Sequence, residues 1–301
     1  MRCDDPLVVL DGGMGRQLER TGAPFRQPEW SALALMEAPG TVLAAHKAFI
    51  AAGAEVITTN SYALVPFHIG DARFAGEAAR LASLAGQLAR QAAQESAVVP
   101  RVAGSLPPLF GSYRPDLFDA ARAPAMLDLL VGALLPHVDL FLAETMSCTA
   151  EALAACAAVR ATGKPVWVSF TLAETAGPPR LRSDEPVRDA VVAAVEAGAK
   201  AVLFNCSPPE VMGAAVDVAR TVLDGMPGHE AVPIGVYANA FPENDGDIDA
   251  NDGISAVRDD LSPARYAGWA ADWRRRGASL IGGCCGIGPE HICALPGRLR
   301  P

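Results

Sequence analysis

The sequence predicts an α/β protein folded as a (β/α)8 barrel in a single domain that spans residues 1–301. Short, almost continuous apolar segments recur along the chain, as is typical of parallel strands that are covered on both faces. Segments rich in alanine and leucine, with helical spacing, separate them. Eight such units favour a closed barrel, with a doubly wound open sheet as the alternative. No low-complexity linker divides the chain.

The predicted strands share an apolar run that ends in polar or glycine residues. In chain order they are LVVLDG (7–12), EVITTN (55–60), RVAGSL (101–106), LFLAET (140–145), PVWVSFTL (165–172), AVLFNCS (201–207), PIGVYANA (233–240) and LIGGCCG (280–286).

The intervening segments carry helix signals. The clearest lies at 71–97, where leucines recur on one face. The segment 262–277 begins with Ser262 as a predicted N-cap and Pro263 at the first helical position. Three glycines are each expected to end a helix just before a strand: Gly53, Gly163 and Gly198.

The composition excludes several kinds of partner. The formal charge is −9 and the sequence pI is about 5.1, so we expect no nucleic-acid or anionic-membrane surface. The basic run at 274–276 fits a helix C-terminus. No apolar run is long enough to span a membrane, and residues 1–13 do not resemble a signal peptide. We therefore expect a cytoplasmic protein. Protein partners cannot be predicted.

Polar residues follow five of the predicted strands. In a parallel barrel these carboxyl ends face one mouth, so residues far apart in sequence converge there. The groups are Asp11-Gly12-Gly13, Thr58-Thr59-Asn60, Glu144-Thr145, Asn205-Cys206-Ser207 and Cys284-Cys285.

The cysteines are the most specific signal. Seven occur without an export signal, so metal binding or catalysis is more plausible than disulfides for a clustered pair. The adjacent Cys284 and Cys285, joined at the mouth by Cys206, would give three thiolates with one open position, which is typical of catalytic zinc. Cys206 alone is equally compatible with a buried apolar role. Cys148, just past the fourth strand, is a possible fourth ligand. The cysteines without expected partners are Cys3, Cys156 and Cys293.

Two carboxylates form a second group. Asp11 and Glu144 each end an apolar strand, where a charge is costly unless it is paired. A bound ammonium group would pair with them, and so would a buried arginine or a backbone amide. Gly12 and Gly13 allow backbone amides to approach an anion such as a carboxylate.

Other motifs carry no site. The acidic segment 243–253 fails as a calcium loop, because Ala250 and Ala256 stand where glycine and glutamate are required. It is expected to be a solvated loop. The histidines form no metal or triad pattern and are His46, His68, His137, His229 and His291.

Five motifs together resemble the homocysteine S-methyltransferase family. They are LDGGMGRQLERTG, ITTNSY, ETMS, FNCS and IGGCCG, whose order and spacing agree over essentially the whole chain. The resemblance implies zinc on Cys206, Cys284 and Cys285. It also implies that Asp11 and Glu144 hold the amino group of homocysteine. The full set expected to bind substrate is Asp11, Gly12, Gly13, Glu144 and Thr145.

The resemblance implies methyl transfer to homocysteine, but two loops differ from those of members that use S-methylmethionine. They are GSLPPLFGSYRPD (104–116) and YANAF (237–241), and both are expected to border the donor. The betaine-type C-terminal arm and the folate and cobalamin modules of methionine synthase are not found. We therefore expect a sulfonium donor, S-methylmethionine or S-adenosylmethionine. Aromatic side chains that can contact such a cation are Phe110, Tyr113, Tyr237 and Phe241.

Other functions remain open at this stage. The same transfer from betaine is one. A non-catalytic barrel that binds zinc or senses thiol oxidation is another, although it would not need an amino-acid pocket. A hydrolase or lyase with a cysteine nucleophile is disfavoured, because no histidine stands at a strand end to activate the thiol.

Overall fold

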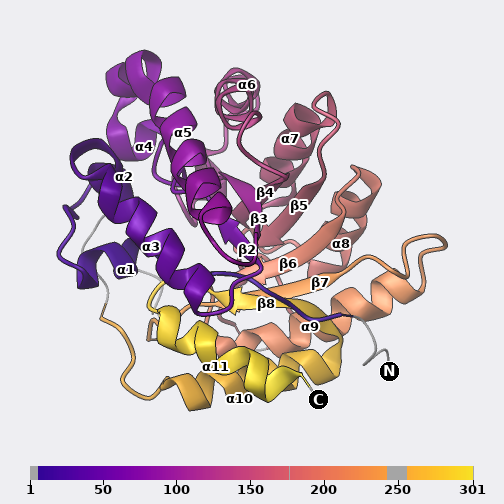
Figure 1. Ribbon diagram of the computed structural model, residues 1–301. Helices are drawn as coiled ribbons and strands as arrows, with labels where there is room; N and C mark the ends of the chain where they lie inside the picture. Colours follow the sequence, from indigo (N-terminus) through magenta and orange to yellow (C-terminus); the bar gives the residue numbers. More distant parts are fainter. Residues whose placement is uncertain (1–5, 176, 243–255, 301) are drawn as a thin grey trace.

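The computed structural model describes residues 6–175, 177–242 and 256–300, which form a barrel of parallel strands surrounded by helices (Figure 1). The acidic segment 243–253 and Cys3 lie outside the described residues. The strands are β1 Val8–Val9, β2 Val56–Thr58, β3 Arg101–Leu106, β4 Leu140–Met146, β5 Val166–Phe170, β6 Ala201–Asn205, β7 Ile234–Ala238 and β8 Ala278–Gly283.

The strand order closes on itself. Neighbours in the sheet run β1-β8-β7-β6-β5-β4-β3-β2, every pair parallel. The first and last of these strands meet through a parallel bridge between Leu10 and Val56. Main-chain hydrogen bonds extend the contact, from Glu55 N–H to Val9 O at 2.7 Å and from Asp11 N–H to Val56 O at 3.0 Å. The barrel prediction is confirmed, and the open doubly wound sheet is excluded.

The helices cover the outside of the sheet (Figure 1). They are α1 Met14–Arg20, α2 Ser31–Glu37, α3 Pro39–Ala51, α4 Pro66–Ile69, α5 Asp71–Gln94, α6 Ala123–Leu134, α7 Thr149–Arg160, α8 Val187–Glu196, α9 Pro209–Asp224, α10 Pro263–Arg276 and α11 Pro289–Leu299, with a 3₁₀ turn, η1, at Pro115–Leu117.

Local signals in the sequence explain where helices begin and end. Ser262 caps α10, because its hydroxyl accepts a hydrogen bond from the Arg265 N–H. The three glycines expected to end helices adopt left-handed backbone angles, with φ of 103° at Gly53, 71° at Gly163 and 103° at Gly198. None of the helices in the described ranges combines the length and apolarity that a membrane span requires.

The core has two layers because successive strand residues point to opposite faces. One set fills the barrel interior: Leu10, Val56, Ala103, Leu140, Leu142, Trp167, Ala201, Leu203, Tyr237 and Leu280. The alternate residues pack against the helices in a larger cluster. Since side chains fill the interior, only the loops at the strand ends are left to form a site.

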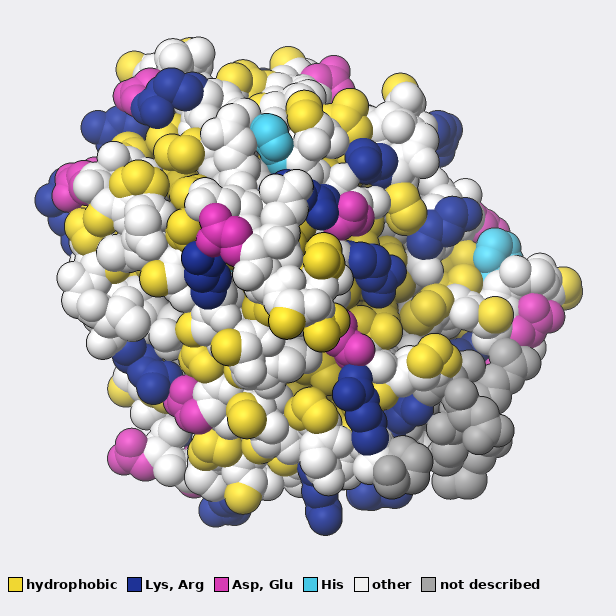
Figure 2. Space-filling model, viewed as in Figure 1, with side chains coloured by type: hydrophobic (Ala, Val, Ile, Leu, Met, Phe, Trp, Pro, Cys, Tyr) yellow, Lys and Arg dark blue, Asp and Glu magenta, His cyan; other side chains and the backbone are white. Residues whose placement is uncertain are grey.

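The surface carries interspersed charges. On the face in Figure 2, basic and acidic side chains alternate rather than gathering by sign. Many are paired locally, such as Arg276 with Asp272 at 2.7 Å.

Candidate metal and substrate site

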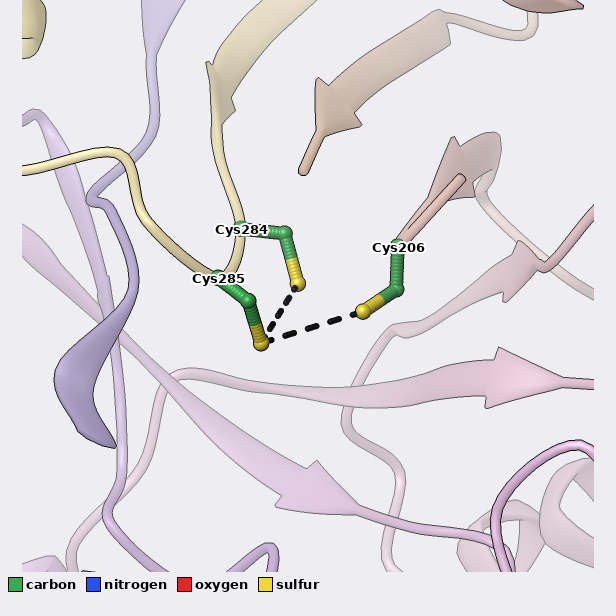
Figure 3. Close-up of side chains that lie close together, drawn as sticks. All are labelled: Cys206, Cys284 and Cys285. Atoms are coloured by element: carbon green, nitrogen blue, oxygen red, sulfur yellow. Dashed lines mark hydrogen bonds between the residues drawn. The ribbon is translucent and has the colours of Figure 1, made fainter. Parts of the chain in front are cut away.

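Three cysteines meet at the carboxyl end of the barrel. Cys206 follows β6, and Cys284 and Cys285 follow β8, with their thiols turned toward one another (Figure 3). The Sγ atoms of Cys206 and Cys285 are 3.9 Å apart, and those of Cys284 and Cys285 are 4.0 Å apart. Tetrahedral zinc with metal–sulfur bonds of about 2.3 Å places its sulfur ligands about 3.8 Å apart. The thiol cluster therefore fits a tetrahedral metal ion.

Glycines allow the loops to approach the cysteines. A Cβ atom on Gly13 would lie 2.5 Å from the carbonyl oxygen of Cys284, and one on Gly282 would lie 2.5 Å from the Cβ of Leu10. Real side chains do not tolerate such distances. Gly13 and Gly282 thus let the ends of β1 and β8 pack directly together, and the Gly283 N–H donates to the Asp11 carbonyl oxygen at 2.9 Å.

Two residues at the mouth adopt a strained backbone. Cys206 has φ of 50° and Thr145 has φ of 61°, in the left-handed region that non-glycine residues rarely occupy. Asn205, which directly precedes Cys206, holds the turn at Thr145. Its side-chain oxygen accepts the Thr145 N–H at 2.9 Å, and its amide donates to the Thr145 hydroxyl at 2.8 Å. The sequence placed Asn205 at a strand end but assigned it no role, because its partner lies 60 residues away.

The three thiols differ in pKa. Hydrogen bonds from Cys284 and Cys285, and one from the Tyr113 hydroxyl at 2.9 Å, hold the pKa of Cys206 well below its usual range. The interaction with Cys206 raises the pKa of Cys284 and of Cys285. One thiolate is thus favoured without a ligand, whereas ionising all three requires a cation among them.

Asp11 and Glu144 are carboxyl groups at the same mouth, the first buried and the second half-buried. Asp11 accepts the Thr58 N–H at 2.7 Å and the Thr58 hydroxyl at 3.2 Å, and burial raises its pKa to about 7. Glu144 accepts the Ser105 hydroxyl at 2.5 Å, and burial raises its pKa to about 8. Neither forms an ion pair within the described part of the chain. A backbone amide therefore reaches Asp11, whereas no arginine of the described ranges neutralises either carboxyl group.

The glycines after β1 have structural tasks. The Gly13 N–H donates to Ile287 O at 2.9 Å, so in this arrangement it is not an open donor for an anion. A Cβ on Gly12 would lie 2.4 Å from the same oxygen. Both positions therefore need glycine to bring this loop onto the segment after the cysteine pair.

The other cysteines are not brought to the thiol cluster. Cys148 is the N-cap of α7, and its N–H donates to Glu151 Oε2 at 3.3 Å. Among the described residues, the group close enough to share a metal consists of Cys206, Cys284 and Cys285. Cys148 is therefore not a fourth ligand in this structure. That group, among the described residues, contains no histidine.

Aromatic side chains line the rim, but several already face a cation. Arginine guanidinium groups lie over Tyr113 at 4.6 Å, Phe110 at 5.4 Å and Phe241 at 5.8 Å from the ring centroids. The hydroxyl of Tyr237 is buried, and it has no hydrogen-bond partner within the described part of the chain. Of the four aromatic residues expected to meet the donor, Tyr237 is thus the one without an arginine on its ring in the described structure.

Comparison with known proteins identifies the family to which this arrangement belongs. The sequence profile of homocysteine S-methyltransferases matches residues 8–299. The chain belongs to the homocysteine S-methyltransferase family. Members of the family transfer a methyl group to homocysteine and form methionine, so homocysteine and a methyl donor are the substrates. The resemblance of the five motifs is confirmed.

Relatives cover nearly the whole chain. The homocysteine S-methyltransferase of Escherichia coli (strain K12) is 30% identical, over 97% of this chain and 95% of its own. The homocysteine S-methyltransferase YbgG of Bacillus subtilis (strain 168) is 28% identical, over 95% and 92%. The crystal structure of the homocysteine methyltransferase MmuM from E. coli in its metallated form superposes with a TM-score of 0.78 at 27% identity, covering 98% of this chain and 97% of that one.

Proposed function

We propose that this methyltransferase is zinc-dependent, with Cys206, Cys284 and Cys285 as the protein ligands. The sulfur spacing of 3.9 and 4.0 Å carries the proposal. Three thiolates leave one coordination position open, as in catalytic rather than structural zinc sites. The related MmuM has been solved in a metallated form, which supports a metal here. When bound, zinc would stabilise the ionised form of a fourth sulfur at neutral pH.

Asp11 and Glu144 recognise the ammonium group of homocysteine in this proposal. Asp11 is buried and Glu144 is half-buried, and both lack an ion pair in the described structure. Loss of solvent raises the pKa of each. An ammonium group would supply the missing charge and draw the proton from each. The hydroxyls of Thr58 and Ser105 hold the carboxylates in place. Gly12, Gly13 and Thr145 complete the homocysteine site as the backbone on which these groups are positioned.

The donor in this proposal is a sulfonium compound, S-methylmethionine or S-adenosylmethionine. The homocysteine thiolate attacks the methyl carbon, the new S–CH₃ bond forms as the bond to the cationic sulfur breaks, and a neutral thioether leaves. Opposite charges are neutralised as the bond forms, so the protein needs no general base for the methyl group. Its task is to align the two sulfurs and the carbon. The ring of Tyr237 and the carboxylates of Asp11 and Glu144 favour a cation at this mouth.

The alternatives are less well supported. Betaine is also cationic and would satisfy the same charge argument, so it is the competing donor. A non-catalytic zinc or thiol sensor has no use for two carboxyl groups beside the thiols. We place the enzyme in the cytoplasm, because three free thiols require reducing surroundings.

The test is metal analysis followed by a donor panel. Purified protein should contain about one zinc ion per chain. With homocysteine, it should form methionine from S-methylmethionine or S-adenosylmethionine, and not from betaine or methyl-folate. Turnover with betaine alone would replace the donor assignment and keep the zinc site. Full activity in protein stripped of metal would overturn the zinc proposal.

A further inference from the structure

The loop after β3 touches the thiol cluster through one side chain. The Tyr113 hydroxyl donates to Cys206 Sγ at 2.9 Å, which is short for a hydrogen bond to sulfur. Cys206 is also the cysteine that stands alone after β6, whereas Cys284 and Cys285 are adjacent. The three ligands proposed for zinc are therefore not equivalent, because one of them has a phenol hydrogen-bonded to it.

The position of Tyr113 is fixed by the loop around it. Its backbone is left-handed, with φ of 66°, and the preceding Gly111 has φ of 137°. Such strain persists only where surrounding contacts over-determine it. One of these contacts is the hydrogen bond between Ser112 and the Tyr62 hydroxyl, at 2.7 Å, which ties the loop to the segment after β2. The phenol is thus held in place rather than resting against the sulfur by chance.

The guanidinium group of Arg182 lies over the ring of this phenol. The Arg182 guanidinium carbon lies 4.6 Å from the centroid of the Tyr113 ring. Glu174 holds Arg182 at 2.8 Å, and the Thr171 hydroxyl lies 3.4 Å from its Nε. A positive charge over the ring draws electron density from it and makes the hydroxyl a stronger hydrogen-bond donor. The contacts therefore form a relay from Arg182 through Tyr113 to the sulfur of Cys206.

We propose that Tyr113 is a positioning residue that weakens the electron donation of Cys206 to the metal, with Arg182 strengthening its effect. A hydrogen-bonded thiolate gives less charge to the ion it binds, so the ion keeps more positive charge for the fourth ligand, the homocysteine sulfur. The same bond makes Cys206 a weaker nucleophile beside a reactive methyl donor. This inference rests on the proposed metal site, and it assigns a task to a loop that differs from those of S-methylmethionine-using members.

Cobalt(II) in place of zinc gives a direct readout. The full-length protein is loaded anaerobically with cobalt, and its sulfur-to-cobalt charge-transfer absorption is compared among wild type, Tyr113→Phe and Cys148→Ala. Loss of the hydrogen bond leaves a more electron-rich sulfur, so Tyr113→Phe should move the band to lower energy. Cys148→Ala removes a buried thiol from the same rim, outside the thiol cluster, and should leave the band in place.

The outcomes separate the two proposals. A wild-type protein that takes up neither cobalt nor zinc would overturn the metal site itself. Metal binding with identical bands in wild type and Tyr113→Phe would overturn the role of Tyr113 alone. Arg182→Met provides a second measurement that keeps the phenol, and it should shift the band in the same direction by a smaller amount. An unshifted band in Arg182→Met would overturn the relay.

Discussion

The thiols and the carboxyl groups at the barrel mouth are prepared for their ligands in different ways. On the thiol side, Cys206 is hydrogen-bonded by the other two cysteines and by Tyr113, so a negative charge is favoured before anything binds. On the carboxyl side, burial raises the pKa of Asp11 to about 7 and of Glu144 to about 8, so both tend to stay neutral.

This difference shows how the thiols and the carboxyl groups each select their ligand. The sulfur positions already match a tetrahedral ion, so the thiol side selects by geometry. The carboxyl side becomes fully charged only when a cation arrives, which favours ligands that bring an ammonium group and excludes those that do not. The predictions that follow test these halves separately.

The largest effect is expected from removing a thiol. Changing Cys206, Cys284 or Cys285 to alanine should lower zinc affinity by more than the roughly 100-fold typical of an outer-shell change, and should abolish methyl transfer. The barrel should remain folded, because these side chains lie in loops after the strands. Zinc content and circular dichroism provide the measurements.

Cys148→Ala is the matched control. It removes a buried thiol from the same rim, outside the thiol cluster, and should retain zinc and activity. Zinc retention in all three cluster variants would contradict the assignment of the ligands.

Glu144→Gln tests the role of the carboxyl groups. It should weaken homocysteine recognition while zinc stays bound. The amide keeps the shape but loses the charge that the ammonium group requires, at a cost of about 2–4 kcal/mol. This corresponds to a roughly 30- to 900-fold fall in kcat/KM for homocysteine. Steady-state kinetics on protein with measured zinc content would show it, and unchanged kinetics would make Glu144 a structural carboxyl.

The pH dependence should follow from the raised pKa values of Asp11 and Glu144. An ammonium group binds the ionised carboxylates, so affinity should rise with pH through about 7 and about 8. We expect 2-aminobutyrate, which has the amino-acid head of homocysteine and no thiol, to bind metal-free protein more than about tenfold better at pH 8 than at pH 6. Calorimetric titration would measure this, and a flat profile would contradict it.

The stability of the ligand-free protein should show the opposite sign. Between about pH 4 and pH 8 the folded carboxyls keep protons that the unfolded chain has lost, so the unfolding free energy falls as pH rises through this window. In Glu144→Gln, which lacks one of the two groups, that dependence should be reduced.

Thr58→Val should have the smallest effect. It removes the hydroxyl that lies 3.2 Å from Asp11 and keeps the backbone N–H at 2.7 Å. A single hydrogen bond of this kind contributes about 0.5–1.5 kcal/mol, or a two- to tenfold rise in KM for homocysteine. A larger loss, with zinc retained, would mean that Thr58 contacts the substrate directly.

Apolar periodicity and polar strand ends were sufficient to predict the barrel and the thiol cluster. Strand neighbours in a barrel follow chain order, so residues at strand ends converge by topology alone. Loop conformation does not follow in this way. The left-handed turn at Cys206, the tether of Gly13 to Ile287 and the contact of Tyr113 with sulfur depend on tertiary packing. Cys148 shows the same limit, because its place after a strand resembles that of Cys206, yet it caps a helix instead.

The spacing of the sulfur ligands along the chain has a mechanical consequence. Cys206 and Cys285 are 79 residues apart, and the segment between them includes α9, β7 and α10. An ion bound by both would stabilise this last part of the barrel, since only the folded chain brings all three sulfurs together. At an ion concentration about 1,000 times the Kd, metal binding would raise the free energy of unfolding by about 4 kcal/mol. The metal would thus stabilise the packing of β6 to β8 as well as bind the sulfur of the substrate.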